Sequence, residues 1–216
     1  MLLSAARAAI VSACLDLVRA GLVTGTAGNV SVRDADLVAV TPSGVRYERL
    51  TPELVGVHRL DGTPAEAPLA PTSELPLHLA LYWARPELGA VVHTHSPAAT
   101  ALSALVDEVP PVHYYTALFG GPVRVAPYAT YGTDELAGHL VRALDQRTGC
   151  LLGNHGAVTV GADLGTALDK SAYLEWLCDV YLRAAAAGTP RLLSPAELDT
   201  VAAKLAGYGQ EPPSAT

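Results

Sequence analysis

The most informative chemistry in this sequence lies in the stretch Val91-Val92-His93-Thr94-His95. Two β-branched apolar residues lead into the histidines, so we expect residues 90–94 to form a short buried strand that runs into a loop. Alternate side chains of a strand lie on the same face, so His93 and His95 should point the same way. Two imidazoles on one face can bind a borderline-soft metal such as zinc. They could equally be two polar residues at a strand end, so a metal site needs further ligands elsewhere in the chain.

A third histidine, His155, lies in the turn Asn154-His155-Gly156 between two apolar runs that hold the backbone at both ends. Three histidine ligands leave an open coordination position, which is typical of catalytic zinc sites. Ser96-Pro97 follows the first pair, so the H-x-H-x-D-H pattern of binuclear hydrolases is absent, as is the H-E-x-x-H of zinc proteases. We interpret the other histidines as ordinary surface or packing residues: His58, His78, His113 and His139.

Glu74 directly follows Thr72-Ser73 at the expected start of a helix. A carboxylate is favoured at a helix N-terminus for purely electrostatic reasons, so this glutamate could be structural. It could also be a base close to the metal, able to bind the metal when no substrate is present. The local sequence leaves both interpretations open.

Three short polar segments contain small hydroxyl side chains but neither lysine nor arginine: Thr26-Ala27-Gly28-Asn29, Ser43-Gly44 and Thr72-Ser73. Backbone N–H groups, hydroxyls and a helix N-terminus can together hold a phosphate without a cation. Each segment alone is also a common turn. The net charge of −7 provides no general attraction for an anion, so a phosphate site would have to be local. The presence of all three segments beside three histidines favours phosphate binding.

Helical and strand-like segments follow one another along the chain without a regular β-α-β period. Thr72-Ser73 should cap the second helix, and the proline-rich residues 63–71 should form a loop. The pattern predicts a single domain over residues 1–216, an α/β fold with a mixed sheet between helix layers, and a loose tail at residues 209–216. Helices are expected at residues 1–20, 74–85, 97–105, 134–145, 164–187 and 195–207, and strands at 30–33, 37–40, 54–60, 90–94, 123–126, 150–152 and 157–160.

Composition narrows the class of protein. Hydrophobic residues make up 50% of the 216 residues and charged ones only 16%, which suggests that other subunits cover part of the surface. The acidic net charge excludes a basic surface for nucleic acid. Residues 2–18 are apolar but interrupted by Arg7 and Asp16, so they predict a helix of the mature protein and neither a signal peptide nor a membrane span. The three widely spaced cysteines fit reduced core thiols of a cytoplasmic protein: Cys14, Cys150 and Cys178.

Several motifs occur together and in a fixed order from about residue 5 to residue 208: Gly28-Asn29-x-Ser31, Thr41-Pro-x-Gly44, Thr72-Ser73-Glu74, His93-Thr-His95, His113-Tyr114 with Gly120-Gly121, Ala126-Pro-Tyr-x-Thr130-x-Gly132 and Asn154-His155-Gly156. As a set they resemble the class II aldolase/adducin-head family, and within it the aldolases of L-fuculose 1-phosphate. The resemblance implies a three-layer α/β/α sandwich whose central mixed sheet is largely antiparallel. It also implies a homotetramer with fourfold symmetry and active sites at the subunit interfaces.

The same resemblance implies roles for individual residues. One Zn²⁺ per subunit would be held by His93, His95 and His155, with Glu74 as acid/base and as a ligand in the resting state. Tyr114 would reach into the active site of a neighbouring subunit. A phosphate pocket would be formed by Gly28, Asn29, Ser43, Gly44, Thr72 and Ser73, with Thr26 nearby.

The implied reaction is the reversible cleavage of a phosphorylated sugar, a ketose 1-phosphate, to dihydroxyacetone phosphate and an aldehyde. The C3–C4 bond breaks with zinc as a Lewis acid, Glu74 protonates the carbon that keeps the electrons, and Tyr114 handles the proton of the C4 oxygen. Two alternatives remain: a pentulose-phosphate dehydratase or epimerase on the same scaffold, and a non-catalytic adducin-like module, which would be expected to lack the histidines. The residues after Tyr208 do not match the family's mobile C-terminal segment, so the aldehyde is not predicted.

Overall fold

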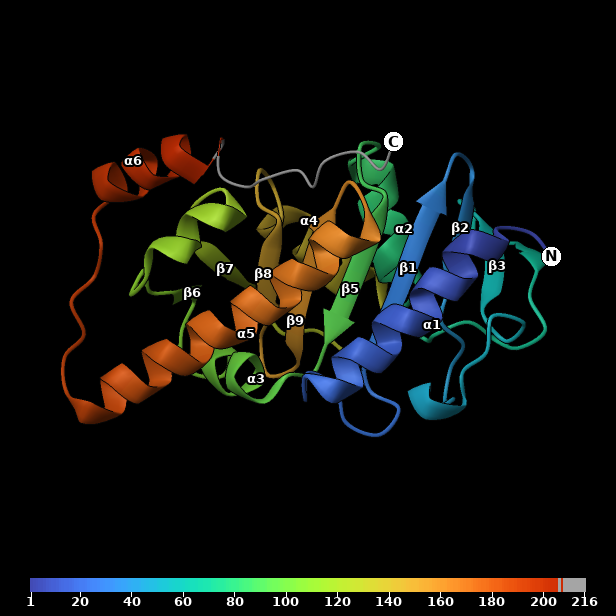
Figure 1. Ribbon diagram of the computed structural model, residues 1–216, viewed down its shortest axis with the longest axis horizontal. Coiled ribbons are helices and arrows are strands. Elements are labelled where there is room, and N and C mark those ends of the chain that lie inside the picture. Colours follow the sequence, from blue (N-terminus) through green and yellow to red (C-terminus); the bar gives the residue numbers. More distant parts are fainter. Residues whose placement is uncertain (206, 208–216) are drawn as a thin grey trace, which may run out of the picture.

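The computed structural model describes residues 1–205 and 207, and it forms three layers with a sheet in the middle (Figure 1). The α-helices are α1 (Ser4–Arg19), α2 (Leu75–Ala84), α3 (Pro97–Ser103), α4 (Asp134–Ala143), α5 (Leu164–Ala187) and α6 (Pro195–Leu205). The strands are β1 (Asn29–Asp34), β2 (Leu37–Val40), β3 (Gly56–Arg59), β4 (Pro64–Glu66), β5 (Ala90–Thr94), β6 (Glu108–Val109), β7 (Val123–Ala126), β8 (Gly149–Leu152) and β9 (Gly156–Gly161). Two 3-10 helices are η1 (Tyr47–Arg49) and η2 (Tyr114–Phe119). The predicted tail at residues 209–216 lies outside the described residues.

Strand β5 lies at the centre of the nine-stranded sheet formed by the described chain, in the order β4-β3-β2-β1-β5-β9-β8-β7-β6. Strand β7 runs parallel to β8, and the other neighbouring strands are antiparallel. On β5, His93 pairs with Asn29 of β1 on one side and with Val158 of β9 on the other. Because β5 is paired with β1 and with β9, the backbone positions of the histidines near its end are fixed.

Helices α1 and α5 cover one face of the sheet, and α2 and α4 cover the other (Figure 1). Alternation along β5 assigns each side chain to a face: Val92 packs in the cluster of Ile10 on α1, whereas Val91 packs with Leu81 of α2 and Leu140 of α4. His93 follows Val91 by two residues, so it points toward the α2 and α4 side. The predicted α/β fold, a mixed and largely antiparallel sheet between helix layers, is confirmed.

Local sequence signals explain where the helices begin. The side chains of Thr133 and Asp163 accept hydrogen bonds from backbone N–H groups in the first turns of α4 and α5. Before α6, Ser194 and Glu197 form a reciprocal capping box, in which the Ser194 backbone donates to the Glu197 carboxylate and the Glu197 backbone donates to the Ser194 hydroxyl.

Two local predictions were wrong, and one strand was not predicted. The segment 63–71, expected to be a loop, contains strand β4; its Pro64 is tolerated because β4 lies at the edge of the sheet that the described residues form. The short edge strand β6 was also missed. Helix α2 begins at Leu75, and its N-cap is Glu74 without a side-chain cap. Instead, Thr72 Oγ1 accepts a hydrogen bond from the Glu74 backbone N–H at 3.2 Å, in the turn before the helix.

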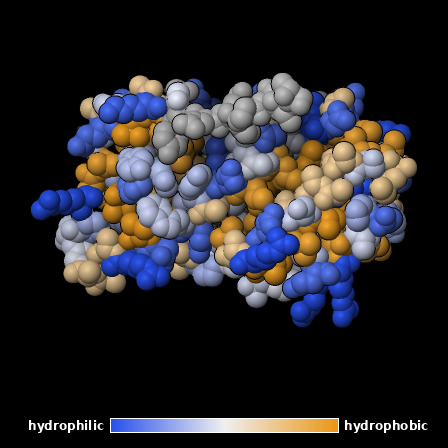
Figure 2. Space-filling model, viewed as in Figure 1, coloured by the Kyte–Doolittle hydropathy of each residue, from blue (hydrophilic) through white to orange (hydrophobic). Residues whose placement is uncertain are grey.

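The surface is partly apolar. Figure 2 shows hydrophobic residues between charged ones on the face that carries α1 and α5. None of the helices in the described part of the chain combines the length and the apolar character needed to cross a membrane. The three cysteines are buried free thiols, as predicted.

Candidate metal and phosphate site

Three imidazoles meet where β5 ends. His93 belongs to β5, His95 follows the strand, and His155 lies in the turn between β8 and β9. Strand β9 pairs with β5 up to the pair Thr94–Ala157, so the residues just beyond this pair lie side by side. The ring centroids are 4.8, 4.9 and 4.8 Å apart, and the Nε2 atoms of His93 and His95 are 2.9 Å apart. As strand alternation predicts, His93 and His95 point the same way.

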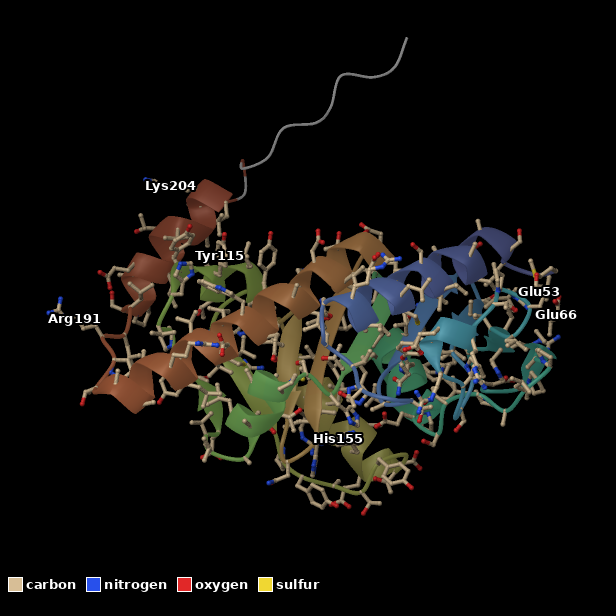
Figure 3. All side chains as sticks on the ribbon, turned by 60° about the horizontal axis from the view of Figure 1, so that its bottom comes forward. Glu53, Glu66, Tyr115, His155, Arg191 and Lys204 are labelled. Atoms are coloured by element: carbon tan, nitrogen blue, oxygen red, sulfur yellow. The ribbon has the colours of Figure 1, made fainter. Side chains whose placement is uncertain are left out.

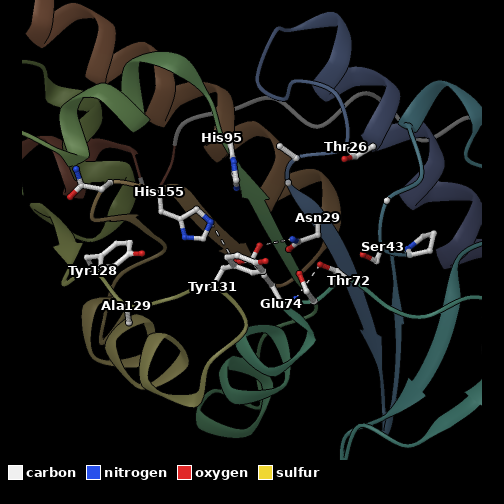
Figure 4. Close-up of a pocket in the computed structure, with 16 residues that line it drawn as sticks. Thr26, Asn29, Ser43, Thr72, Glu74, His95, Tyr128, Ala129, Tyr131 and His155 are labelled. Carbon is white, nitrogen blue, oxygen red and sulfur yellow. Dashed lines mark hydrogen bonds and ion pairs between the residues drawn. The ribbon is translucent and has the colours of Figure 1, made fainter.

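The carboxylate of Glu74 completes this cluster (Figure 4). Its Oε2 lies 3.1 Å from Nε2 of His93, and its Oε1 lies 3.5 Å from Nε2 of His155. One ligand atom from each of Glu74, His93, His95 and His155 lies within 4.8 Å of all the others. His93 Nδ1 is 2.9 Å from the carbonyl oxygen of Ala157, which can only accept, so Nδ1 donates and Nε2 faces the cluster.

The donor set fits a divalent cation. Three imidazole nitrogens and one carboxylate are the ligands that zinc commonly takes. Oε1 of Glu74 is buried without a hydrogen-bond partner within the described chain, and a buried carboxylate oxygen left in this state is costly. A cation between the four side chains would satisfy this atom.

The electrostatics of the cluster keep the imidazoles of His95 and His155 neutral, and so able to bind a cation, whereas Glu74 favours the charged form of His93. Burial, with the nearby charge of His93, lowers the pKa of His95 and that of His155 to about 4. Burial acts against the charged form of Glu74 as well, but attraction and hydrogen bonding from His93 outweigh it and hold the pKa of this carboxyl below its ordinary value. Burial lowers the pKa of His93, and the same carboxylate reverses that effect and raises it.

A cavity of about 460 Å³ adjoins the cluster (Figure 4). All the residues predicted to bind phosphate line it: Thr26, Gly28, Asn29, Ser43, Gly44, Thr72 and Ser73. Glu74, His95 and His155 line it too, so the predicted phosphate and metal residues share one cavity. No lysine or arginine is found among the lining residues that the structure describes. Helix α2 begins beside Ser73, and its N-terminus favours an anion.

The loop before β1 approaches the backbone of β5 at His93 so closely that only glycine fits. Gly28 has φ +85°, in the left-handed region, and a Cβ atom there would lie 2.8 Å from the carbonyl oxygen of His93 and 3.0 Å from Cγ1 of Val23. Gly28 therefore lets the loop touch the backbone of β5 and places the following residue, Asn29, beside Glu74.

The structure also brings residues to the site that were given no role. Tyr128 and Tyr131 line the cavity mouth, and both are strongly exposed. His78, interpreted as an ordinary surface or packing residue, is completely buried and hydrogen-bonded to Asn29, so it belongs to the surroundings of the site. Burial lowers the pKa of His78 to about 3, which keeps it neutral. Its signal in the sequence was its spacing of four residues from Glu74.

Tyr114 is not brought to this cavity. It lies on η2 and is 43% exposed, and it shares a second cavity with the aromatic residues Tyr115, Tyr173 and Trp176. Figure 3 shows the adjacent Tyr115 well away from His155. Within one chain, therefore, Tyr114 cannot act on a molecule bound beside Glu74.

Comparisons with known proteins match the chain over most of its length. A family model described as class II aldolase and adducin N-terminal domain matches residues 8–182. The 5-deoxy-D-ribulose 1-phosphate aldolase of Bacillus thuringiensis serovar kurstaki is 38% identical over 213 residues, which cover 98% of this chain and 100% of that protein. The L-fuculose phosphate aldolase of Escherichia coli K12 is 41% identical over 202 residues, which cover 93% of this chain and 94% of that protein. A solved structure of an L-fuculose 1-phosphate aldolase superposes with a TM-score of 0.92 at 34% identity and covers 95% of this chain and 98% of its own.

Proposed function

The chain belongs to the class II aldolase and adducin N-terminal domain family, and we propose that it cleaves a ketose 1-phosphate reversibly to dihydroxyacetone phosphate and an aldehyde. The family membership confirms the resemblance that the order of the motifs indicated. One observation carries the proposal: a cluster of three histidines and a glutamate opens into a cavity whose other wall carries hydroxyls and glycines. The phosphate end of a sugar phosphate is suited to the wall of hydroxyls and glycines, and its sugar end is suited to the cluster of histidines and glutamate.

We propose Zn²⁺ as the metal, one per subunit, on His93, His95, His155 and Glu74. Class II aldolases depend on a metal, and the three nitrogen donors favour zinc over the hard cations magnesium and calcium. When bound, the cation supplies a Lewis acid for the oxygens next to the bond that breaks.

Glu74 would move the proton at the substrate carbon. When the C3–C4 bond breaks, its electron pair stays on C3 and the C4 hydroxyl loses a proton. Glu74, holding a proton as a carboxylic acid, then delivers it to C3 to give dihydroxyacetone phosphate and is left as a carboxylate; in the aldol direction the carboxylate takes the same proton back from C3. The carboxylate is suited to this role because it is buried and its Oε1 accepts no hydrogen bond within the described chain.

The phosphate would bind at the wall formed by Thr26, Gly28, Asn29, Ser43, Gly44, Thr72 and Ser73. Hydrogen bonds from hydroxyl and backbone N–H groups to a phosphate are charge-assisted and need no cation. L-fuculose 1-phosphate is our first candidate substrate, and 5-deoxy-D-ribulose 1-phosphate is the second, because relatives of similar identity act on each. Both are 1-phosphates of 2-ketoses, so they differ only in the aldehyde half.

We further propose a homotetramer in which Tyr114 completes the site of a neighbouring subunit and handles the proton of the C4 oxygen. Two observations support this arrangement. Tyr114 is far from the cavity of its own chain, and it lies beside the exposed aromatic side chains of Tyr173 and Trp176, which favour a protein interface.

A mixing experiment tests the shared site. Tyr114→Phe subunits and Glu74→Gln subunits, each inactive alone, should regain part of the activity when they exchange into mixed oligomers. Mixed oligomers of proven composition that stay inactive would refute the shared site.

The assay that tests the proposed function follows the metal-dependent release of dihydroxyacetone phosphate from a panel of ketose 1-phosphates. The metal-free protein and Glu74→Gln serve as controls. Loss of water from the substrate without release of dihydroxyacetone phosphate would instead identify a dehydratase. Failure of the zinc-loaded protein to cleave any member of the panel would refute the proposal.

A further inference from the structure

A chain of buried hydrogen bonds leads from Glu74 into the layer between β1 and α2. Asn29 Nδ2 lies 2.9 Å from Glu74 Oε2, and Asn29 Oδ1 lies 2.5 Å from His78 Nε2. On the other side of the imidazole, His78 Nδ1 lies 2.7 Å from Ser31 Oγ, which in turn lies 2.8 Å from the hydroxyl of Tyr82. The side chains of Asn29, Ser31, His78 and Tyr82 are at most 3% exposed.

Two sequence periods build this chain. Glu74, the N-cap of α2, is followed at four-residue intervals by His78 and Tyr82 inside the helix, so the three side chains lie along one stripe. Asn29 and Ser31 are two residues apart on β1 and therefore share the sheet face that α2 covers. Polar groups buried this deeply must satisfy one another, so the five side chains fit together as one unit.

The chemistry of Glu74 fixes the direction of every bond. A carboxylate can only accept, so the Asn29 amide nitrogen faces it and the Asn29 oxygen faces His78. That oxygen can only accept as well, so His78 carries its proton on Nε2 and donates it. In a neutral imidazole Nδ1 must then accept, so Ser31 donates to Nδ1 and accepts from Tyr82.

We propose that His78 is a positioning residue, which fixes the amide of Asn29 and through it the orientation of the Glu74 carboxylate. This inference rests on the proposed role of Glu74 in the aldolase reaction. Asn29 engages Oε2, which leaves Oε1, the oxygen that accepts no hydrogen bond within the described chain and faces Nε2 of His155, for the metal and the proton. Without His78 the amide of Asn29 can turn over, and its oxygen would then repel the carboxylate.

Two substitutions at one position separate positioning from mere packing. His78→Leu fills the space but removes the donor. His78→Gln keeps an N–H group able to reach the oxygen of Asn29. As a matched control, Ser171→Ala removes another buried hydroxyl, which bonds Thr159 at 2.6 Å on the far side of the sheet and, among the described residues, makes no hydrogen bond to the site.

The measurements are the dissociation constant of Co²⁺ with its visible spectrum, and kcat and KM for a cleaved ketose 1-phosphate. His78→Leu should weaken Co²⁺ binding and lower kcat, each by about 10- to 100-fold, the usual effect of removing a side chain that orients a ligand. KM should change less than kcat, because Asn29 is the one described residue of the phosphate wall that bonds His78, and the other hydroxyl and backbone donors of the wall stay in place. His78→Gln should restore most of both losses, and Ser171→Ala should lower only the stability.

A second measurement is made on the native protein, and the His78→Gln variant serves only to assign the signal. Nitrogen-15 NMR of labelled histidine, with His78 assigned by its absence from His78→Gln, should show a neutral ring protonated on Nε2. A ring protonated on Nδ1, or on both nitrogens at neutral pH, would overturn the inference. So would native-like Co²⁺ binding and kcat in His78→Leu, or equal losses in the Leu and Gln variants or in Ser171→Ala. If the native protein cleaved no ketose 1-phosphate, the proposed function alone would fail, and the Co²⁺ and NMR results would still decide the role of His78.

Discussion

Replacing Gly28 by alanine should damage the site in a way that can be worked out from the structure. The residue has φ +85°, and an added Cβ would lie 2.8 Å from the His93 carbonyl oxygen, a backbone atom that cannot move without shifting β5. Gly25, in the same loop, offers a matched control. It has φ +66°, and no heavy atom lies within 4 Å of the position of its Cβ.

The two substitutions share one cost and differ in another. A side chain in the left-handed region costs about 1–2 kcal/mol at either position. Only at Gly28 does the overpacking against β5 add about 1–3 kcal/mol more. We therefore expect Gly25→Ala to lower the free energy of unfolding by about 1–2 kcal/mol and Gly28→Ala by about 2–5 kcal/mol.

Urea unfolding of the metal-free proteins at one subunit concentration measures this difference. A shift of the loop away from β5 also moves Asn29 and, with it, the part of the phosphate wall that this loop forms. Loss of one charge-assisted hydrogen bond, worth about 1.5–3 kcal/mol, corresponds to a rise in KM of at least about tenfold. Gly25→Ala should leave KM nearly unchanged. If Gly28→Ala destabilised the protein no more than Gly25→Ala, the close contact with the His93 carbonyl would not exist and the argument would be refuted.

Three further results are expected. His155→Ala should lose the metal, which native protein should hold at about one per chain; metal analysis that finds a full complement in the variant would contradict the ligand set. Ser73→Ala should raise KM for a phosphorylated ketose by removing a hydrogen bond worth about 1.5–3 kcal/mol, and equal turnover of phosphorylated and unphosphorylated substrate by the native enzyme would argue against the phosphate wall. Burial lowers the pKa of His78 from its ordinary value of 6.5 to about 3, so its contribution to stability is complete above pH 6.5 and is lost as the pH falls toward 3, because the unfolded chain binds the proton first. Between these limits the free energy of unfolding should fall more steeply in native protein than in His78→Gln, by up to about 1.4 kcal/mol per pH unit, and parallel urea-derived profiles would disprove the burial of a neutral ring.

The features that depend on neighbours along the chain could be predicted from the order of the residues. The apolar periodicity and the capping residues placed most helices and strands, including residues 164–187 as the longest helix. The type and spacing of His93 and His95 predicted two side chains on one face, because a strand alternates whatever surrounds it. The edge strands β4 and β6 were missed because a short strand at an edge is defined by its partner and carries little signal of its own.

The tertiary structure alone decided which distant residues meet. Glu74 could have been only a helix-terminal carboxylate until Asn29, 45 residues away, was found bonded to it beside the histidines. His78 looked ordinary because its partners lie on β1, 47 and 49 residues away, and no local pattern reveals such contacts. Tyr114 was separated from the cavity for the same reason, since the path of η2 depends on its packing with α5 and α6. Spacing along the chain determines which face of an element a side chain takes, whereas the packing of one element on another determines which faces meet.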